Sequence, residues 1–276
     1  KLTGDHIRWI YHTIRDKDPR QLKFVFALWT RAMIVDVIKR EFGIRLSKTS
    51  VGRLLHQLGF SCQKPLYRAY QRNSEIVEQW KNQVYPELQK RAKKEGADIF
   101  FEDESRVRSD FHAGTTWALK GQTPVVQTTG ARFGLNMIAA ITARGEMHFM
   151  TVKGTVTAEI ICEFLKRLMH GRDRKVFLIW DGHPTHKSKK VRQCAESFEG
   201  QLEIFLLPSY SPDLNPTEQL WNHTKSNGVG RQPVSGPDAL KRAVISKLRS
   251  LQMLPGKIAS FFKHPDCYYI LDSECL

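Results

Sequence analysis

Apolar residues recur at helical spacing through the first sixty residues, in segments that begin and end with capping residues. Thr3 can cap a helix whose apolar positions, 7, 10, 11 and 14, fall on one face. Thr30 precedes a second such segment, which stops at Gly43, and Ser47 precedes a third, which stops at Gly59. The pattern therefore predicts a small all-α unit at the start of the chain.

The last two of these helices are joined by a tight link and have the form of a helix-turn-helix. In such a unit the second helix enters the major groove with its N-terminal residues towards the base edges. The residues at that position are Lys48, Thr49, Ser50 and Arg53. The basic, extended segment 60–65, which contains Lys64, follows as a wing would. A helical bundle with ordinary solvated charges is the alternative. We expect a helix-turn-helix or winged-helix DNA-binding domain over residues 1–65.

The pattern changes from helices to strands near residue 97. Before it, residues 66–96 predict a linker that contains one long helix. After it, apolar runs predict strands at 99–102, 116–119, 135–142, 147–152, 175–180 and 202–207. Antiparallel strands followed by alternating helices and strands indicate an α/β fold with a mixed sheet, of the ribonuclease H-like type. We assign residues 97–230 to this catalytic domain and residues 231–276 to a helical extension.

Three acidic residues occupy similar places in this predicted domain. Asp103 and Asp181 directly follow apolar strands, and Glu218 lies in the first turn of a helix that Asn215 can cap. If the strands at 99–102 and 175–180 are neighbours, their carboxyl ends bring the two aspartates together, and Glu218 approaches from the helix. Three oxygen ligands suit Mg²⁺, and two ions about 3.5–4 Å apart can assist phosphodiester chemistry. The pattern therefore predicts a metal-dependent active site.

The composition limits the kinds of binding partner to be expected. Lys and Arg number 43 against 28 Asp and Glu, which gives a net charge of +15 and favours a polyanion. The five cysteines are odd in number, widely spaced and free of any Cys-x-x-Cys pair, so a disulfide framework is not expected. This pattern indicates a protein of the reducing cytoplasm. No apolar run has the length of a membrane span, so no membrane partner is expected. The chain starts without Met, as a fragment would.

Other acidic residues compete with the three as ligands. Glu102 and Glu104 flank Asp103, and the alternation of side chains along a strand points both away from it, which indicates a structural role. Asp213 lies in the Pro-rich loop before Glu218 and is an alternative ligand to it.

Two histidines and a tryptophan also lie close to the acids. His183 and His186 follow Asp181, but no further His or Cys has zinc-ligand spacing nearby, so we expect them to bond within the loop or to lie near a phosphate. Trp221, one turn beyond Glu218, is expected to anchor its helix in the core. The cations expected around a DNA channel are Lys187, Lys189, Lys190, Arg192, Lys225 and Arg231.

Three motifs resemble a known family. They are FEDE at 101–104, WDGHPTH at 180–186 and, most specifically, LPSYSPDLNPTEQLW at 207–221. Together they resemble the DDE transposases of the mariner-like superfamily, in its bacterial insertion-sequence branch. The interval 182–217 is close to the short spacing between the last two acids of that group, and residues 29–65 are similar to its second helix-turn-helix.

The resemblance implies a function. Asp103, Asp181 and Glu218 would be the catalytic triad, holding two Mg²⁺ ions, with Mn²⁺ as a substitute. The activity would be cut-and-paste transposition: cleavage of double-stranded DNA at inverted-repeat ends, then strand transfer into target DNA, commonly at TA. A homodimer that associates with the bacterial nucleoid is implied. Family members usually carry two helix-turn-helix units, and one is evident.

Two other functions fit part of the pattern. A ribonuclease H-like nuclease acting on RNA in a hybrid would have the same carboxylates, but it would not require a helix-turn-helix. A catalytically silent, transposase-derived DNA-binding protein would have no reason to keep all three acids.

Overall fold

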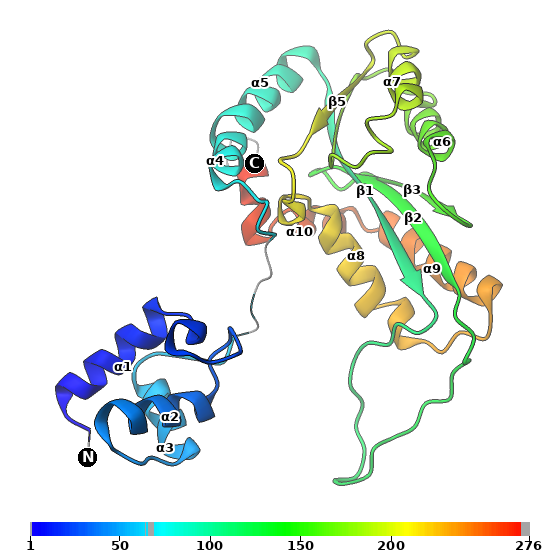
Figure 1. Cartoon of the computed structure of the whole chain (residues 1–276). Coiled ribbons are helices and arrows are strands. Elements are labelled where there is room, and N and C mark those ends of the chain that lie inside the picture. The colour runs from blue at the N-terminus through cyan, green and yellow to red at the C-terminus, as the bar shows by residue number, and fades with distance from the viewer. Residues whose placement is uncertain (1, 64, 66–68, 272–276) are drawn as a thin grey trace. The chain divides into compact units, whose positions relative to one another are not determined.

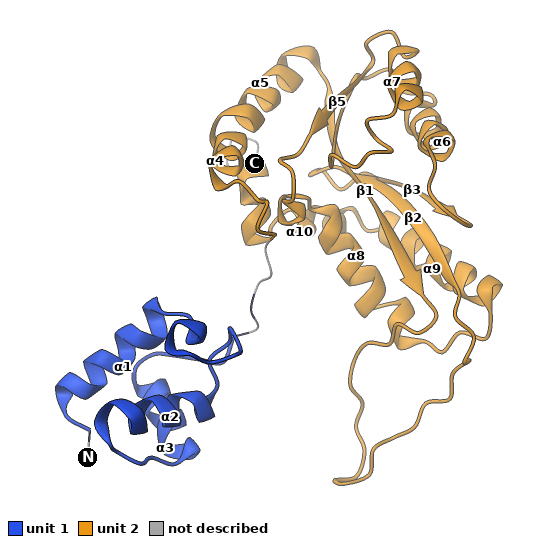
Figure 2. Cartoon of the chain, in the orientation of Figure 1, with its two compact units in different colours: residues 1–67 blue, residues 68–276 orange. Residues whose placement is uncertain are grey.

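The chain forms two compact units, residues 1–67 and residues 68–276, each with a core of its own (Figure 2). The computed structural model describes residues 2–63, 65 and 69–271. Within these residues, no helix has both the length and the apolar character needed to span a membrane.

The first unit is helical, as the capping pattern predicts. It contains α1 (Gly4–Asp16), a short 3₁₀ turn (Pro19–Leu22), α2 (Arg31–Phe42) and α3 (Lys48–Gln57). Thr3, Thr30 and Ser47 each accept a hydrogen bond from a backbone N–H in the first turn of the helix that follows. Gly43 ends α2 in the left-handed conformation, with φ of 68°. Ile10, Ile34, Ile38 and Val51 form a buried hydrophobic cluster at the centre of this unit.

A helical segment opens the second unit, where a linker was expected. It consists of α4 (Ser74–Gln79), a π turn (Trp80–Val84) and α5 (Tyr85–Glu95). The π turn ends two residues before Pro86, which has no N–H to donate to the previous turn and would clash with a carbonyl of that turn in a regular α-helix. Trp80 and Tyr85 are buried, so this segment packs into the core of the second unit.

A five-stranded sheet forms the centre of the second unit, in the order β3-β2-β1-β4-β5 (Figure 1). Its strands are β1 (Asp98–Arg108), β2 (Gly134–Ile141), β3 (Met147–Val152), β4 (Val176–Trp180) and β5 (Leu202–Leu206). β1 pairs antiparallel with β2 and parallel with β4, so the predicted mixed sheet and the predicted neighbours are confirmed.

Helices cover both faces of the sheet. One face packs against α6 (Ala158–Met169) and α7 (Lys189–Glu196). The other packs against α5, α8 (Thr217–Ser226), α9 (Pro237–Gln252) and α10 (Pro255–Phe261). A 3₁₀ segment (Pro265–Ile270) also belongs to this second layer, so the C-terminal helices are part of the core of the unit rather than an appendage. Figure 1 shows the two layers on opposite sides of the strands.

Two strand predictions were wrong. No strand forms at residues 116–119: the segment between β1 and β2 is irregular, and Trp117 is fully exposed, because no partner strand lies beside it. The first strand does not stop at Glu102. It continues to Arg108, because β2 pairs with it as far as Gly134.

Candidate active site beside strands β1 and β4

The three acids predicted to form a metal site lie around one open cavity of about 510 Å³. Asp103 comes from β1, Asp181 directly follows β4, and Glu218 lies in the first turn of α8. The loop that joins β5 to α8 forms another wall of this cavity, from Leu207 to Pro212. Three segments that are distant in sequence therefore bring their carboxylates to one place.

Asp103 reaches the cavity through the geometry of β1. The parallel pairing with β4 ends at Phe101 opposite Ile179, so Asp103 lies two residues beyond the shared segment. Side chains alternate along a strand, which puts Asp103 on the same face as the buried Phe101, the face that α8 covers. There the indole Nε1–H of Trp221 donates a hydrogen bond to Oδ2 of Asp103 at 3.0 Å.

Asp181 is held by the loop that follows it. The backbone N–H of His183 donates to its Oδ1 at 2.9 Å, and Nδ1 of His186 lies 2.9 Å from the same oxygen. Burial disfavours the charged form of this carboxyl, but the hydrogen bonds from His186 and His183 outweigh burial and leave the pKa of Asp181 below its usual value. Asp181 is therefore held as a carboxylate.

The pKa values of Asp103 and Glu218 are shifted in the opposite direction to that of Asp181. Burial raises the pKa of Asp103 well above its usual value, and the neighbouring charges of Glu218, Glu104 and Asp181 raise it further. Burial also raises the pKa of Glu218; Lys225 opposes this shift and Asp181 adds to it. Carboxylates that repel one another at a partly buried site favour a bound cation.

The buried Asn215 ties the start of α8 to the sheet. Its Nδ2 donates to the backbone oxygen of Glu102 at 2.9 Å, and its Oδ1 accepts a hydrogen bond from the backbone N–H of Thr217 at 3.1 Å. The expected capping role of Asn215 is therefore present, although Pro216 lies between it and the first helical residue. These bonds set where α8 begins and therefore where Glu218 lies in its first turn.

Asp213, the alternative ligand, has another partner. Its Oδ2 accepts a hydrogen bond from Nη2 of Arg72 at 2.9 Å, and this ion pair is mostly buried, with 25% of the Asp213 side chain exposed. Asp213 is absent from the lining of the cavity that Glu218 shares with the two aspartates.

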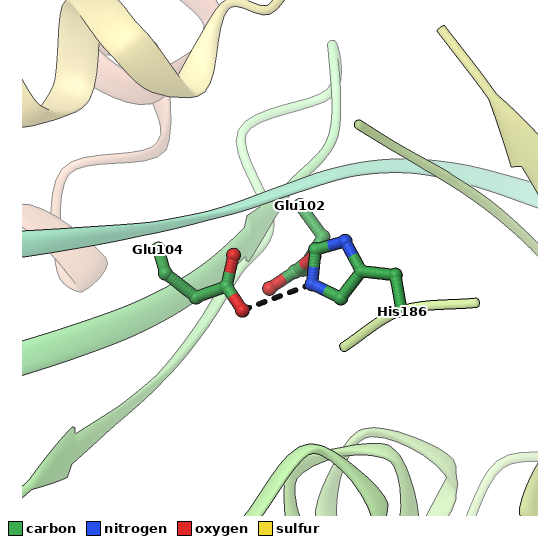
Figure 3. Close-up of side chains that lie close together, drawn as sticks. All are labelled: Glu102, Glu104 and His186. Atoms are coloured by element: carbon green, nitrogen blue, oxygen red, sulfur yellow. Dashed lines mark hydrogen bonds and ion pairs between the residues drawn. The ribbon is translucent and has the colours of Figure 1, made fainter. Parts of the chain in front are cut away.

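The acids flanking Asp103 lie on the opposite face of β1, as alternation predicts. Figure 3 shows Glu102 and Glu104 beside His186, which comes from the loop after β4. Nε2 of His186 lies 2.9 Å from Oε1 of Glu104 and 3.9 Å from Oε2 of Glu102. Burial would lower the pKa of His186, but the hydrogen bonds to Asp181 and Glu104 raise it to about 11. His186 thus links the two faces of the sheet at this point.

Among the cations expected around the site, Lys187 lines the cavity itself. Lys190 instead forms an ion pair with Glu159 at 2.6 Å, and Arg231 donates to the backbone oxygen of Ser226. Of the predicted cations, Lys187 therefore lies at the cavity wall. Lys225 is close enough to Glu218 for its charge to lower the pKa of that carboxyl group.

The residues predicted to read DNA lie in the first unit. Lys48, Thr49 and Ser50 are exposed in the first turn of α3, and Arg53 is exposed near its middle. Lys64 lies outside the described residues. Segment 60–63 has no regular secondary structure.

Two supporting residues were not identified from the sequence as partners of the acids. Trp221 is three residues after Glu218, so helical geometry alone would have put both on one face of α8. For His186, the contact with Glu104 joins residues 82 positions apart, and no local signal marks it.

The chain is similar to known families and structures over most of its length. A family described as DDE superfamily endonuclease matches residues 98–241, just over half of the chain, and a winged helix-turn-helix family matches residues 25–84. An insertion element IS630 uncharacterized 39 kDa protein of Shigella sonnei is 23% identical over 257 residues, which cover 91% of this chain and 73% of that protein.

Two solved structures share the fold. A pre-cleavage Mos1 transpososome is 15% identical with a TM-score of 0.60, covering all of this chain and 80% of the other. A mariner Mos1 paired-end complex with Mg is 17% identical with a TM-score of 0.56, covering all of this chain and 89% of the other. These matches bear out the expected ribonuclease H-like and helix-turn-helix fold and the resemblance to mariner-like transposases. The chain belongs to the DDE superfamily endonucleases.

Proposed function

We propose that this endonuclease is a transposase that cuts DNA at the ends of a mobile element and joins the freed 3′ end to target DNA, with Asp103, Asp181 and Glu218 as its catalytic carboxylates. The observation that carries the proposal is the gathering of these three side chains around one cavity, next to β1, β4 and α8. The relatives support the reaction: one is an insertion-element protein, and the shared fold includes a Mos1 strand transfer complex.

The three carboxylates fit a divalent metal. Their donor set is all oxygen, and two of the three, Asp103 and Glu218, are held in surroundings that penalise their charge. A bound divalent ion would supply the positive charge that in-line phosphoryl transfer requires. The Mos1 complexes with Mg and with Mn support Mg²⁺ as the ion and Mn²⁺ as its substitute. Two ions are proposed from the chemistry of in-line phosphoryl transfer, in which one ion assists the attacking oxygen and the other the leaving oxygen.

The protein's own residues position the reaction. Asp181, kept ionised by His183 and His186, is a ligand that is ready without losing a proton. Trp221 anchors one oxygen of Asp103, and Asn215 fixes the start of the helix that carries Glu218. Lys187, on the cavity wall, is placed to attract the phosphate of a bound strand.

The first unit would provide recognition of double-stranded DNA. The exposed polar residues on α3, Lys48, Thr49, Ser50 and Arg53, would face the major groove. Lys64 is proposed, from the sequence alone, to contribute a DNA contact. A homodimer would bring two element ends together, as the paired-end complexes of Mos1 transposase suggest. We place the protein in the cytoplasm, on nucleoid DNA.

Strand cleavage by the full chain on linear DNA that carries an element end tests the proposal. With Mg²⁺ or Mn²⁺ we expect cleavage and strand transfer, and EDTA should abolish both. Asp181→Asn should reduce cleavage by at least about 100-fold, because it removes several kcal/mol of charge stabilisation. Cleavage that survives in this variant would refute the site. DNA binding without any metal-dependent cleavage in the wild type would favour a silent regulator.

A further inference from the structure

A second polar cluster lies behind the candidate active site, on the other face of β1. It consists of Glu102 and Glu104 from the strand and His186 from the loop after β4 (Figure 3). One ligand atom of each side chain lies within 4.8 Å of the others. The proposed transposase chemistry gives this cluster no ligand.

Glu102 is the feature that needs an explanation. Its side chain is 0% exposed, and neither of its carboxylate oxygens has a hydrogen-bond partner among the described residues. A buried carboxyl without a partner costs several kcal/mol unless a proton or a cation neutralises it. The carboxyl group points towards His186 and lies beside the carboxyl group of Glu104.

His186 is oriented as a metal-binding histidine would be. Its Nδ1 is bonded to Oδ1 of Asp181, and its Nε2 faces the two glutamates. A histidine that binds metal through one nitrogen commonly gives the N–H of the other to a carboxylate, which fixes the ring. The ring is also stacked on Trp180, with centroids 4.2 Å apart and planes 9° apart.

We propose that Glu102, Glu104 and Nε2 of His186 bind a divalent first-row transition ion, Mn²⁺ being the representative probe, at a site separate from the three catalytic carboxylates. Ligand distances of about 2.0–2.2 Å allow ligand atoms to lie about 3–4 Å apart. The separations of Nε2 from Glu104 and Glu102, 2.9 and 3.9 Å, have this range. Two carboxylates balance the charge of the ion, and the imidazole nitrogen selects a transition ion over Mg²⁺.

The ion would act on the catalytic site through Asp181. It would hold His186 in the tautomer that carries its proton on Nδ1, so that this proton is donated to Asp181. The competing explanation is that no ion binds, and that His186 is an imidazolium that donates to Asp181 and to Glu104 together. The two explanations differ in one observable, a nitrogen ligand to a metal.

Pulsed electron paramagnetic resonance of the DNA-free full chain with Mn²⁺ distinguishes them. The three catalytic carboxylates offer oxygen only, but His183 also lines their cavity. Coupling of Mn²⁺ to an imidazole ¹⁴N therefore reports the second site where it persists in His183→Gln. We expect this coupling in the wild type and in Asp103→Asn. A wild-type spectrum without it at saturating Mn²⁺ would overturn the site in favour of the imidazolium.

Variants then assign the ligands. His186→Gln should abolish the nitrogen coupling, whereas His183→Gln, in the same loop, should retain it. Glu104→Gln, which keeps the shape of a partly exposed side chain, should weaken Mn²⁺ binding at this site by at least about tenfold. Coupling that persists in His186→Gln would refute the assignment. Circular dichroism checks that each variant is folded, and the wild-type spectrum tests the site without any variant.

The result is independent of the proposed function. If the chain fails to cleave DNA but shows the nitrogen coupling, the second site stands and the transposase proposal falls. If it cleaves DNA without the coupling, the reverse holds.

Discussion

The indole N–H of Trp221 donates to Oδ2 of Asp103 at 3.0 Å, so the helix that carries Glu218 also holds Asp103, and both are proposed catalytic acids. Trp221 is almost fully buried, and its bond crosses from α8 to β1. Movement of α8 would therefore displace Glu218 and Asp103 together. The hydrogen bond gives this helix a role in aligning the site that goes beyond core packing.

Replacing Trp221 by Phe should weaken metal binding at the site while most of the core packing is kept. Removing a partner of a liganding carboxylate typically costs about 10- to 100-fold in metal affinity or activity. We expect the Mg²⁺ concentration for half-maximal cleavage to rise by about tenfold. The control is Leu220→Val, which removes a buried methylene from the same helix and should lower stability alone. Equal Mg²⁺ dependence in the two variants would show that the indole bond has no such role.

Asp213 and Glu218 should respond oppositely to amide substitution. Asp213→Asn weakens the pair with the buried Arg72 and should destabilise the fold by about 1–3 kcal/mol in urea unfolding, while cleavage stays within about threefold. Glu218→Gln should instead abolish cleavage at little cost in stability. If Asp213→Asn lost cleavage and Glu218→Gln kept it, the third catalytic acid would have to be reassigned.

The stability of the metal-free protein should fall as the pH rises above about 5. The pKa of Asp103 is above its ordinary value of 3.8, so the folded state holds a proton that the unfolded state has released, and stability is lost as the pH rises towards the folded pKa. His186, with a pKa of about 11 against an ordinary 6.5, acts in the same direction at higher pH.

Thermal unfolding between pH 5 and pH 8 measures this effect, at about 2–4 °C for each kcal/mol. Asp103→Asn should flatten the profile, and Mg²⁺ should flatten that of the wild type, because a cation favours the ionised carboxylates. Stability that rises over this range in the metal-free wild type would contradict the electrostatics of the cavity.

DNA binding should depend on α3. Arg53→Ala should weaken binding to an element end. If Arg53 contacts a phosphate, the slope of log affinity against log salt concentration should decrease by about one. If it contacts a base, the variant should instead show a relaxed sequence preference. Lys39→Ala removes an exposed cation from α2 instead and serves as the matched control. Equal losses in the two variants would mean that binding follows net charge rather than the recognition helix.

The sequence predicts those parts of the site that local geometry determines. Asp181 follows a run of buried residues and Glu218 lies in the first turn of a helix, and both positions follow from neighbouring residues. The position of Asp103 was harder to predict, because the end of β1 depends on its pairing with β2, which is distant in sequence. The packing of residues 74–95 could not be predicted for a similar reason: the burial of Trp80 and Tyr85 is decided by contacts with residues distant in sequence.

Long-range polar contacts could not be predicted at all. The ion pair of Arg72 with Asp213 spans 141 positions, and the contact of His186 with Glu104 spans 82. Any basic or acidic residue could make such contacts, so spacing does not distinguish the true partners. Alternation along β1 did predict that Glu102 and Glu104 point away from Asp103, but it did not predict what they meet.

The two faces of strand β1 carry different acidic groups. Asp103 faces the cavity, and Glu102 and Glu104 face the opposite layer. Inserting or deleting one residue before Glu102 would exchange the two sides, placing a pair of glutamates in the cavity and a lone aspartate behind it. This part of the strand therefore cannot change in length by a single residue and keep either site.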